Sequence, residues 1–296
     1  MMTYNYENLP QPLQSWTFQH PNQPPVPHPV WPYIAQAPWA QDLEHEFRER
    51  DQPLTFVLVH GSWADASFWS GIAAELRKKG HTVYVPEFPG HGADPNKAAT
   101  HAMMTKSIAD YVTSHNLKNI ILVGHSFGGS LVQKVAEHIP DRLKRLVFMN
   151  AFVLKDGGSL ADEFPPSMKA MFKQLVESSK DNTVLLPFPL FRESFANLAS
   201  YAQAQQLYKK VTPEPAGPLF EKFDLKKFYS LQVPKSYVHL MEDTAIPLGS
   251  PDYGWHPHMS SRLGLYRFIQ AHGDHMSTAQ FEPKLIARKI YEASRD

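Results

Sequence analysis

Apolar residues recur along residues 54–151 in two alternating patterns: short continuous runs, and longer stretches with helical spacing. Continuous runs of aliphatic residues are typical of strands buried on both faces, and a spacing of three to four residues is typical of amphipathic helices. The runs that predict strands are residues 54–60, 82–86, 119–123 and 146–151. The stretches that predict helices are residues 70–79, 100–115 and 130–139. This alternation predicts an α/β fold, with a mostly parallel, twisted sheet and helices on both of its faces.

The alternation stops at residue 152 and resumes near residue 234. Two amphipathic patterns in this interval, at 166–178 and 191–210, predict helices. The apolar run between them contains Pro187 and Pro189, which rule out a central strand there. We therefore predict a mainly helical cap inserted at 152–233.

The predicted core is formed by residues 54–151 and 234–296. Its second part begins with a predicted strand and ends with a predicted helix. The elements predicted in it are strands at 236–240 and 266–269 and helices at 252–263 and 282–294.

Residues 1–53 combine ten prolines with aromatic residues such as Trp16, Trp31 and Trp39. Proline fixes φ and lacks an N–H donor, so neither a long helix nor a central strand is expected, although residues 42–50 allow a short helix. Unstructured tails contain few aromatic residues. We predict an extended arm that packs on the main domain or on a neighbouring subunit, and the alternative is an unstructured leader. Either a monomer or a homodimer is compatible with this arm.

The composition excludes several classes of site. The chain has 296 residues, a formal net charge of zero and no cysteine. Disulfides, thiolate metal sites and a cysteine nucleophile are therefore excluded, and bulk attraction to nucleic acid or an anionic membrane is not expected. The polar N-terminus does not resemble a secretory signal, and no apolar run is long enough to span a membrane. These features predict a cytoplasmic protein.

The sequence from Gly124 to Gly129 reads Gly-His-Ser-Phe-Gly-Gly, between a predicted strand and a predicted helix. This is the strand–turn–helix context of a G-x-S-x-G nucleophile elbow. A serine at such a sharp turn has a strained backbone, and its neighbours approach so closely that Gly124 and Gly128 are required. The pattern predicts Ser126 as the nucleophile; the alternative is an ordinary glycine-rich turn with a capping serine.

A serine hydroxyl needs a base, and in this arrangement the base is a histidine after the last strand. His275 lies between the last predicted strand and the final helix, and His272 is its competitor. A carboxylate should orient the imidazole from the end of the preceding strand. Asp243 has that position, with Glu242 and Asp156 as alternatives.

An oxyanion hole needs two backbone N–H donors. Phe127 directly follows the nucleophile, and Ser62 follows the His-Gly turn after the first predicted strand. We predict the amides of these two residues as the donors. Gly61, Trp63 and His125 flank them and are predicted to contact the substrate.

On the basis of these motifs, residues 54–296 resemble the α/β-hydrolase superfamily, and within it the small serine esterases of the plant methylesterase and hydroxynitrile lyase type. The resemblance implies an α/β-hydrolase fold and triad roles for Asp243 and His275. The matching segments are Val-His-Gly at 59–61, Gly-His-Gly at 90–92, the elbow at 123–129, Glu-Asp-Thr-Ala-Ile-Pro at 242–247 and Gly-Asp-His-Met at 273–276.

Two positions differ from the lyases of that family. The lyases have a threonine where this chain has Gly61, and a lysine where this chain has Met276. Because that lysine stabilises the departing cyanide, its absence implies hydrolysis rather than cyanohydrin cleavage.

The function predicted from these residues is hydrolysis of a carboxylic ester, a lactone or an activated amide with an apolar or aromatic portion. The alternatives are a cofactor-free dioxygenase on the same fold and a non-catalytic receptor for a small ligand. No phosphate-binding glycine loop is present, so no cofactor is expected. His256 with His258, and His272 with His275, lack the spacing of a metal site, so no metal is expected.

Overall fold

The computed structural model describes residues 52–247 and 250–296. The arm predicted at 1–53 and the short helix predicted at 42–50 therefore lie outside the described residues, apart from positions 52 and 53.

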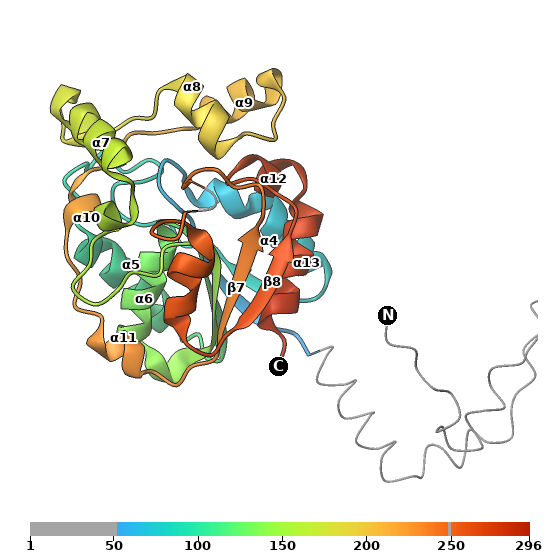
Figure 1. Cartoon of the computed structure of the whole chain (residues 1–296). Coiled ribbons are helices and arrows are strands. Elements are labelled where there is room, and N and C mark those ends of the chain that lie inside the picture. The colour runs from blue at the N-terminus through green and yellow to red at the C-terminus, as the bar shows by residue number, and fades with distance from the viewer. Residues whose placement is uncertain (1–51, 248–249) are drawn as a thin grey trace, which may run out of the picture. The chain divides into compact units, whose positions relative to one another are not determined.

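A six-stranded sheet forms the centre of residues 53–296 (Figure 1). Its strand order is β2-β1-β3-β4-β7-β8, and every neighbouring pair is parallel. This confirms the predicted parallel α/β sheet. The strands are β1 (Thr55–Val59), β2 (Thr82–Tyr84), β3 (Ile120–Ser126), β4 (Leu143–Ala151), β7 (Lys235–Leu240) and β8 (Arg267–Ala271).

Helices cover both faces of this sheet, as predicted (Figure 1). On one face α4 packs against α13, and on the other α6 packs against α5 and α11. Thr100 caps α5, because its side chain accepts the Met103 N–H, and Pro283 begins α13 at a position that needs no N–H donor. These helices are α4 (Ser70–Lys78), α5 (His101–Ser114), α6 (Gly128–His138), α11 (Lys226–Ser230), α12 (Ser277–Phe281) and α13 (Pro283–Ser294).

The segment between β4 and β7 contains mostly short helices, of which α7, α8 and α9 lie above the sheet in Figure 1. Two short strands, β5 and β6, pair antiparallel within this segment. We call this pair the cap ribbon. The elements are η5 (Leu160–Glu163), α7 (Pro166–Ser178), β5 (Thr183–Val184), α8 (Phe188–Leu190), η6 (Phe191–Phe195), α9 (Tyr201–Tyr208), β6 (Glu214–Pro215) and α10 (Gly217–Phe220).

Two predicted helices are interrupted. The pattern at 191–210 forms the π turn η6 and then α9, because Ser200 and Gln203 form a capping box that starts a new helix. The pattern at 252–263 forms only η7 (Trp255–Met259) and η8 (Ser260–Leu263). Within η7, His256 is extended because it precedes a proline. Among the described residues, no helix has both the length and the apolar character needed to cross a membrane.

Side chains of the central strands form much of the hydrophobic core, so shortening one of them should lower the free energy of unfolding. Leu58 in β1 is fully buried, whereas Leu265 is 98% exposed. We expect Leu58→Ala to lower the free energy of unfolding by about 2–5 kcal/mol, because it leaves a cavity. Leu265→Ala, the matched control, should change it by less than about 0.5 kcal/mol. Urea unfolding measures both, and equal effects would contradict the assignment of β1 to the core.

Candidate active site

Ser126 ends β3 with a φ of 53°, the left-handed conformation expected for a nucleophile at a sharp turn. Its carbonyl accepts the Phe152 N–H at 3.0 Å, which fixes the turn to the chain after β4. A Cβ on Gly61 would lie 2.6 Å from the Cβ of Ser126. The hydroxyl therefore stands at a point where two chain segments nearly touch.

The glycines of the elbow are required by the same crowding. A Cβ on Gly124 would lie 2.6 Å from the carbonyl oxygen of Gly128. A Cβ on Gly128 would lie 2.6 Å from the carbonyl oxygens of Val59 and His60. Because these obstacles are backbone atoms, no side chain can rotate away to relieve them.

The structure brings together the three residues predicted as the triad. Nε2 of His275 lies 2.9 Å from Oγ of Ser126, and Nδ1 of His275 lies 2.6 Å from Oδ2 of Asp243. All three side chains are buried. Hydrogen bonds thus join a serine, a histidine and a carboxylate in the order that activation of a serine hydroxyl requires.

Asp243 is itself held by two donors that fix the carboxylate. The Ala245 N–H donates to Oδ1 at 2.9 Å, and Nδ2 of Asn150 donates to Oδ2 at 2.5 Å. Asn150 has a φ of 35°. Its side-chain Nδ2 also donates to the Leu240 carbonyl, and its Oδ1 accepts the Leu240 N–H. Asn150 carries no local sequence signal, because only the pairing of β4 with β7 brings it beside Asp243.

The residues that were alternatives to His275 and Asp243 have other partners. His272 is exposed and contacts Glu242 at 3.1 Å, and Glu242 also accepts the Gly273 N–H at 2.7 Å. Asp156 accepts the Leu225 N–H at 2.8 Å. None of these three contacts involves Ser126 or His275, so the geometry favours Asp243 and His275.

The two amides predicted as oxyanion donors are free. Among residues 52–247 and 250–296, neither the Ser62 N–H nor the Phe127 N–H donates a hydrogen bond. Phe127 immediately precedes α6, so its amide lies at the positive end of that helix. Both amides are therefore able to donate to an added oxygen.

A pocket of about 330 Å³, its mouth included, adjoins Ser126, His275 and Ser62. Trp255 stacks on the His275 ring at 5.3 Å, and Phe195 meets that ring edge-on at 5.3 Å. Apart from the site residues, the lining is apolar. It consists of Ser62, Trp63, Ser126, Phe152, Leu160, Phe164, Phe172, Phe195, Leu219, Ala245, Ile246, Trp255 and His275.

Of the three residues predicted to contact the substrate, Trp63 lines this pocket, whereas Gly61 and His125 do not. Gly61 faces Ser126 and has no side chain to extend. His125 is 2% exposed and stacks on Phe68 at 4.6 Å. Burial, and then the neighbouring His275, hold the pKa of His125 well below its ordinary value. His125 thus packs behind the His275 ring at a ring distance of 4.6 Å, and its contact with substrate stays a prediction.

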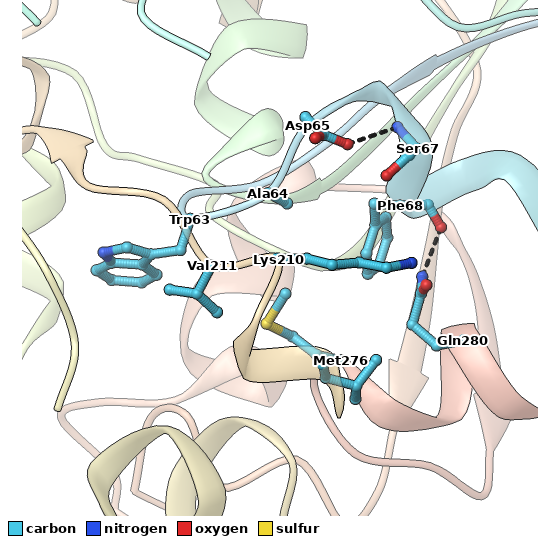
Figure 2. A pocket seen from close by; sticks show the side chains of 10 residues that line it. Trp63, Ala64, Asp65, Ser67, Phe68, Lys210, Val211, Met276 and Gln280 are labelled. Atoms are coloured by element: carbon cyan, nitrogen blue, oxygen red, sulfur yellow. Dashed lines mark hydrogen bonds between the residues drawn. The ribbon is translucent and has the colours of Figure 1, made fainter. Parts of the chain in front are cut away.

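A second hollow adjoins Trp63 and Met276 (Figure 2). Lys210 extends across it between Phe68 and Met276. Within the described part of the chain, the Lys210 ammonium forms no ion pair. The lining is Trp63, Ala64, Asp65, Ser67, Phe68, Leu207, Lys210, Val211, Met276 and Gln280.

The histidines weighed as metal ligands have other partners. His256 contacts Oγ of Ser260 at 2.7 Å, and His258 contacts Glu163 at 3.1 Å. In residues 52–247 and 250–296 no three His, Asp or Glu side chains are grouped so as to hold a metal ion.

Residues 56–288 match the model of the alpha/beta hydrolase family. The chain is 59% identical to a solved structure described as "Extracellular alpha/beta-hydrolase from Paenibacillus species shares structural and functional homology to Tobacco Salicylic Acid Binding Protein 2". That match has a TM-score of 0.81 and covers 82% of this chain and 100% of the other. Polyneuridine aldehyde esterase, at 20% identity and a TM-score of 0.62 over 82% of this chain and 100% of the other, shares the fold.

Curated relatives include esterases. The chain is 36% identical over 124 residues to the carbendazim hydrolyzing esterase of Nocardioides sp., which covers 40% of this chain and 51% of that protein. It is 28% identical over 211 residues to methylesterase 1 of Arabidopsis thaliana, which covers 65% of this chain and 79% of that protein. The chain spans about half the length of the carbendazim hydrolyzing esterase and of several putative chloroplastic methylesterases of Arabidopsis thaliana.

Asn150 should matter for turnover because it holds the triad carboxylate. We expect Asn150→Ala to lower kcat for an aryl ester about 10- to 100-fold, since a hydrogen bond to a charged group contributes about 1.5–3 kcal/mol. Asn182→Ala is the control, because Asn182 also has a left-handed φ of 55° but directly precedes β5, outside the pocket lining. Steady-state kinetics compares the two variants, and equal kcat values would remove Asn150 from the site.

Proposed function

The chain belongs to the alpha/beta hydrolase family, and from this premise we propose that it is a serine esterase that forms an acyl-enzyme on Ser126. One observation carries the proposal: the imidazole of His275 lies 2.9 Å from the Ser126 hydroxyl, within reach of its proton. The names of the esterase relatives support the same reaction class.

The first half of the reaction forms the acyl-enzyme. Oγ of Ser126 attacks the ester carbonyl carbon, and Nε2 of His275 takes the hydroxyl proton. The carbonyl oxygen becomes an oxyanion, which the amides of Ser62 and Phe127 hold. When the tetrahedral intermediate collapses, the C–O bond to the alcohol breaks and His275 gives its proton to the leaving alkoxide.

The second half hydrolyses the acyl-enzyme. His275 takes a proton from water, whose oxygen attacks the same carbonyl carbon, and the bond to Ser126 breaks with return of the proton to Oγ. Overall, one ester and one water are converted to one acid and one alcohol. In both halves the buried Asp243 stabilises the imidazolium that forms between proton transfers.

The lining of the pocket favours an uncharged substrate. Beyond the catalytic groups it offers rings and aliphatic side chains, so a charged group there would lose its hydration without a partner. Flat rings such as Phe164, Phe172 and Trp255 suit an aromatic acyl or alcohol portion. We propose a small, neutral aryl or arylalkyl ester as the substrate class.

The residue after the base, Met276, favours hydrolysis over cyanohydrin cleavage. Met276 supplies a thioether there rather than an ammonium, and its N–H donates to the Phe195 carbonyl at 2.9 Å. A cytoplasmic location and a monomeric or homodimeric state stay predictions from the sequence.

The nucleophile is tested by Ser126→Ala on a panel of aryl esters, methyl esters and lactones. We expect kcat/KM to fall at least about 10³-fold for every substrate that the wild type cleaves, because the acyl-enzyme cannot form. Circular dichroism checks that the variant is folded. Full turnover by the variant would remove this mechanism, and oxygen uptake with a quinolone would favour the dioxygenase alternative.

The substrate class is tested by Phe164→Leu. Phe164 meets Phe172 at a ring distance of 4.9 Å in the pocket. We expect KM for a phenylacetate methyl ester to rise about 2- to 10-fold, since aromatic pairs contribute about 0.5–1.5 kcal/mol. KM for methyl acetate should stay unchanged. Phe188→Leu, an aromatic residue of the cap outside the pocket lining, is the control, and equal shifts in both variants would contradict an aromatic-binding pocket.

A further inference from the structure

Trp63 has an uncommon backbone conformation in the turn after β1. Its φ is 59°, in the left-handed region that bulky side chains rarely adopt. Such a conformation costs free energy and persists only where surrounding contacts hold it. The peptide group of Trp63 directly follows Ser62, whose amide the proposed mechanism uses. The contacts that hold Trp63 therefore act one residue away from that amide.

The cap ribbon contacts Trp63 at two places. The main-chain N–H of Trp63 donates to Oε2 of Glu214 at 2.9 Å. Its indole N–H donates to the carbonyl of Val184 at 2.8 Å. Val184 and Glu214 are register partners in the cap ribbon, so one piece of secondary structure holds both the backbone and the side chain. The ribbon thus opposes relaxation of the turn toward ordinary φ values.

Glu214 is a buried carboxylate with a buried cationic partner. Its Oε2 also contacts Nε2 of His91 at 2.9 Å, and Nδ1 of His91 lies 3.2 Å from the carbonyl oxygen of Pro89. Both neighbours of the ring accept hydrogen bonds, which requires an N–H at each nitrogen. Burial alone would lower the pKa of His91, but the Glu214 carboxylate overrides this and raises it.

This pairing has a consequence for an adjacent oxyanion. A lone carboxylate at the Trp63 amide would repel negative charge forming one residue away, at the Ser62 amide. The His91 imidazolium offsets that charge while leaving Oε2 as an acceptor. Burial would raise the pKa of Glu214, but the His91 contacts hold it below its ordinary value.

We infer that Glu214 is a positioning residue: its carboxylate, presented by the cap ribbon, holds the strained backbone of Trp63 so that the Ser62 amide faces the oxyanion. The inference rests on the proposed esterase function, because it assigns the Ser62 amide to the oxyanion hole. It makes the cap a part of the catalytic geometry as well as a wall of the pocket.

Kinetics of Glu214 variants on an aryl ester tests this role. Glu214→Leu removes the acceptor, and we expect kcat to fall about 10- to 100-fold with KM within about twofold, because a misdirected oxyanion donor weakens binding of the transition state. Glu214→Gln keeps an amide oxygen that can accept the Trp63 N–H. It should keep kcat within about threefold of the wild type.

Glu163→Leu is the matched control. Glu163 is also a buried cap carboxylate, and it pairs with Arg262 at 2.7 Å without touching the turn after β1. We expect it to lower the melting temperature while kcat stays within about twofold of the wild type. An equal fall of kcat in Glu163→Leu and Glu214→Leu would overturn the inference, and so would an unchanged kcat in Glu214→Leu.

Two further measurements cover other outcomes. If Glu214→Leu does not fold, Glu214→Asp keeps the charge but shortens the reach, and a kcat equal to that of the wild type would overturn the inference. Hydrogen exchange at the Trp63 amide needs no substrate. Strong protection in the wild type supports the clamp and fast exchange overturns it, even if no ester is cleaved and the proposed function itself fails.

Discussion

The left-handed backbone at Ser126 is the constraint on which the rest of the site depends. It places the hydroxyl where β3 ends and α6 begins, and this turn lies so close to the end of β1 that Gly61 and Gly128 tolerate no Cβ. A sheet of six parallel strands provides this geometry because the carboxyl ends of its strands meet at one edge. The parallel sheet thus determines both the position of the elbow and the short distance from Ser126 to the His275 imidazole.

Carboxylates that hold backbone N–H groups keep the loops around this point in place. Asp243 accepts the Ala245 N–H, Glu87 accepts the Ala66 N–H, and Glu214 accepts the Trp63 N–H. Each of these carboxylates also contacts a histidine, at 2.6, 2.7 and 2.9 Å respectively. Asp243 and Glu214 are buried, and pairing with histidine makes a buried carboxylate tolerable, whereas Glu87 is exposed.

The sequence predicts the parts of the molecule that local patterns encode. Hydrophobic runs predict all six sheet strands, and the elbow motif with chain order predicts Ser126, Asp243 and His275. Contacts between distant segments are not encoded in this way. Glu214 is 151 residues from Trp63 in the chain, and Asn150 is 93 residues from Asp243, so neither has a local signal. The helix expected at 252–263 fails because the periodic pattern does not register the local effect of Pro257.

Covalent labelling of the wild-type protein with a fluorophosphonate, followed by peptide mapping by mass spectrometry, tests the central claim most directly. The reagent needs an activated serine beside an oxyanion hole, and no knowledge of the natural substrate. We predict one adduct per chain, on Ser126, and a labelling rate that falls at least about 100-fold in His275→Ala. An adduct on another serine, or equal labelling rates for the two proteins, would contradict the account.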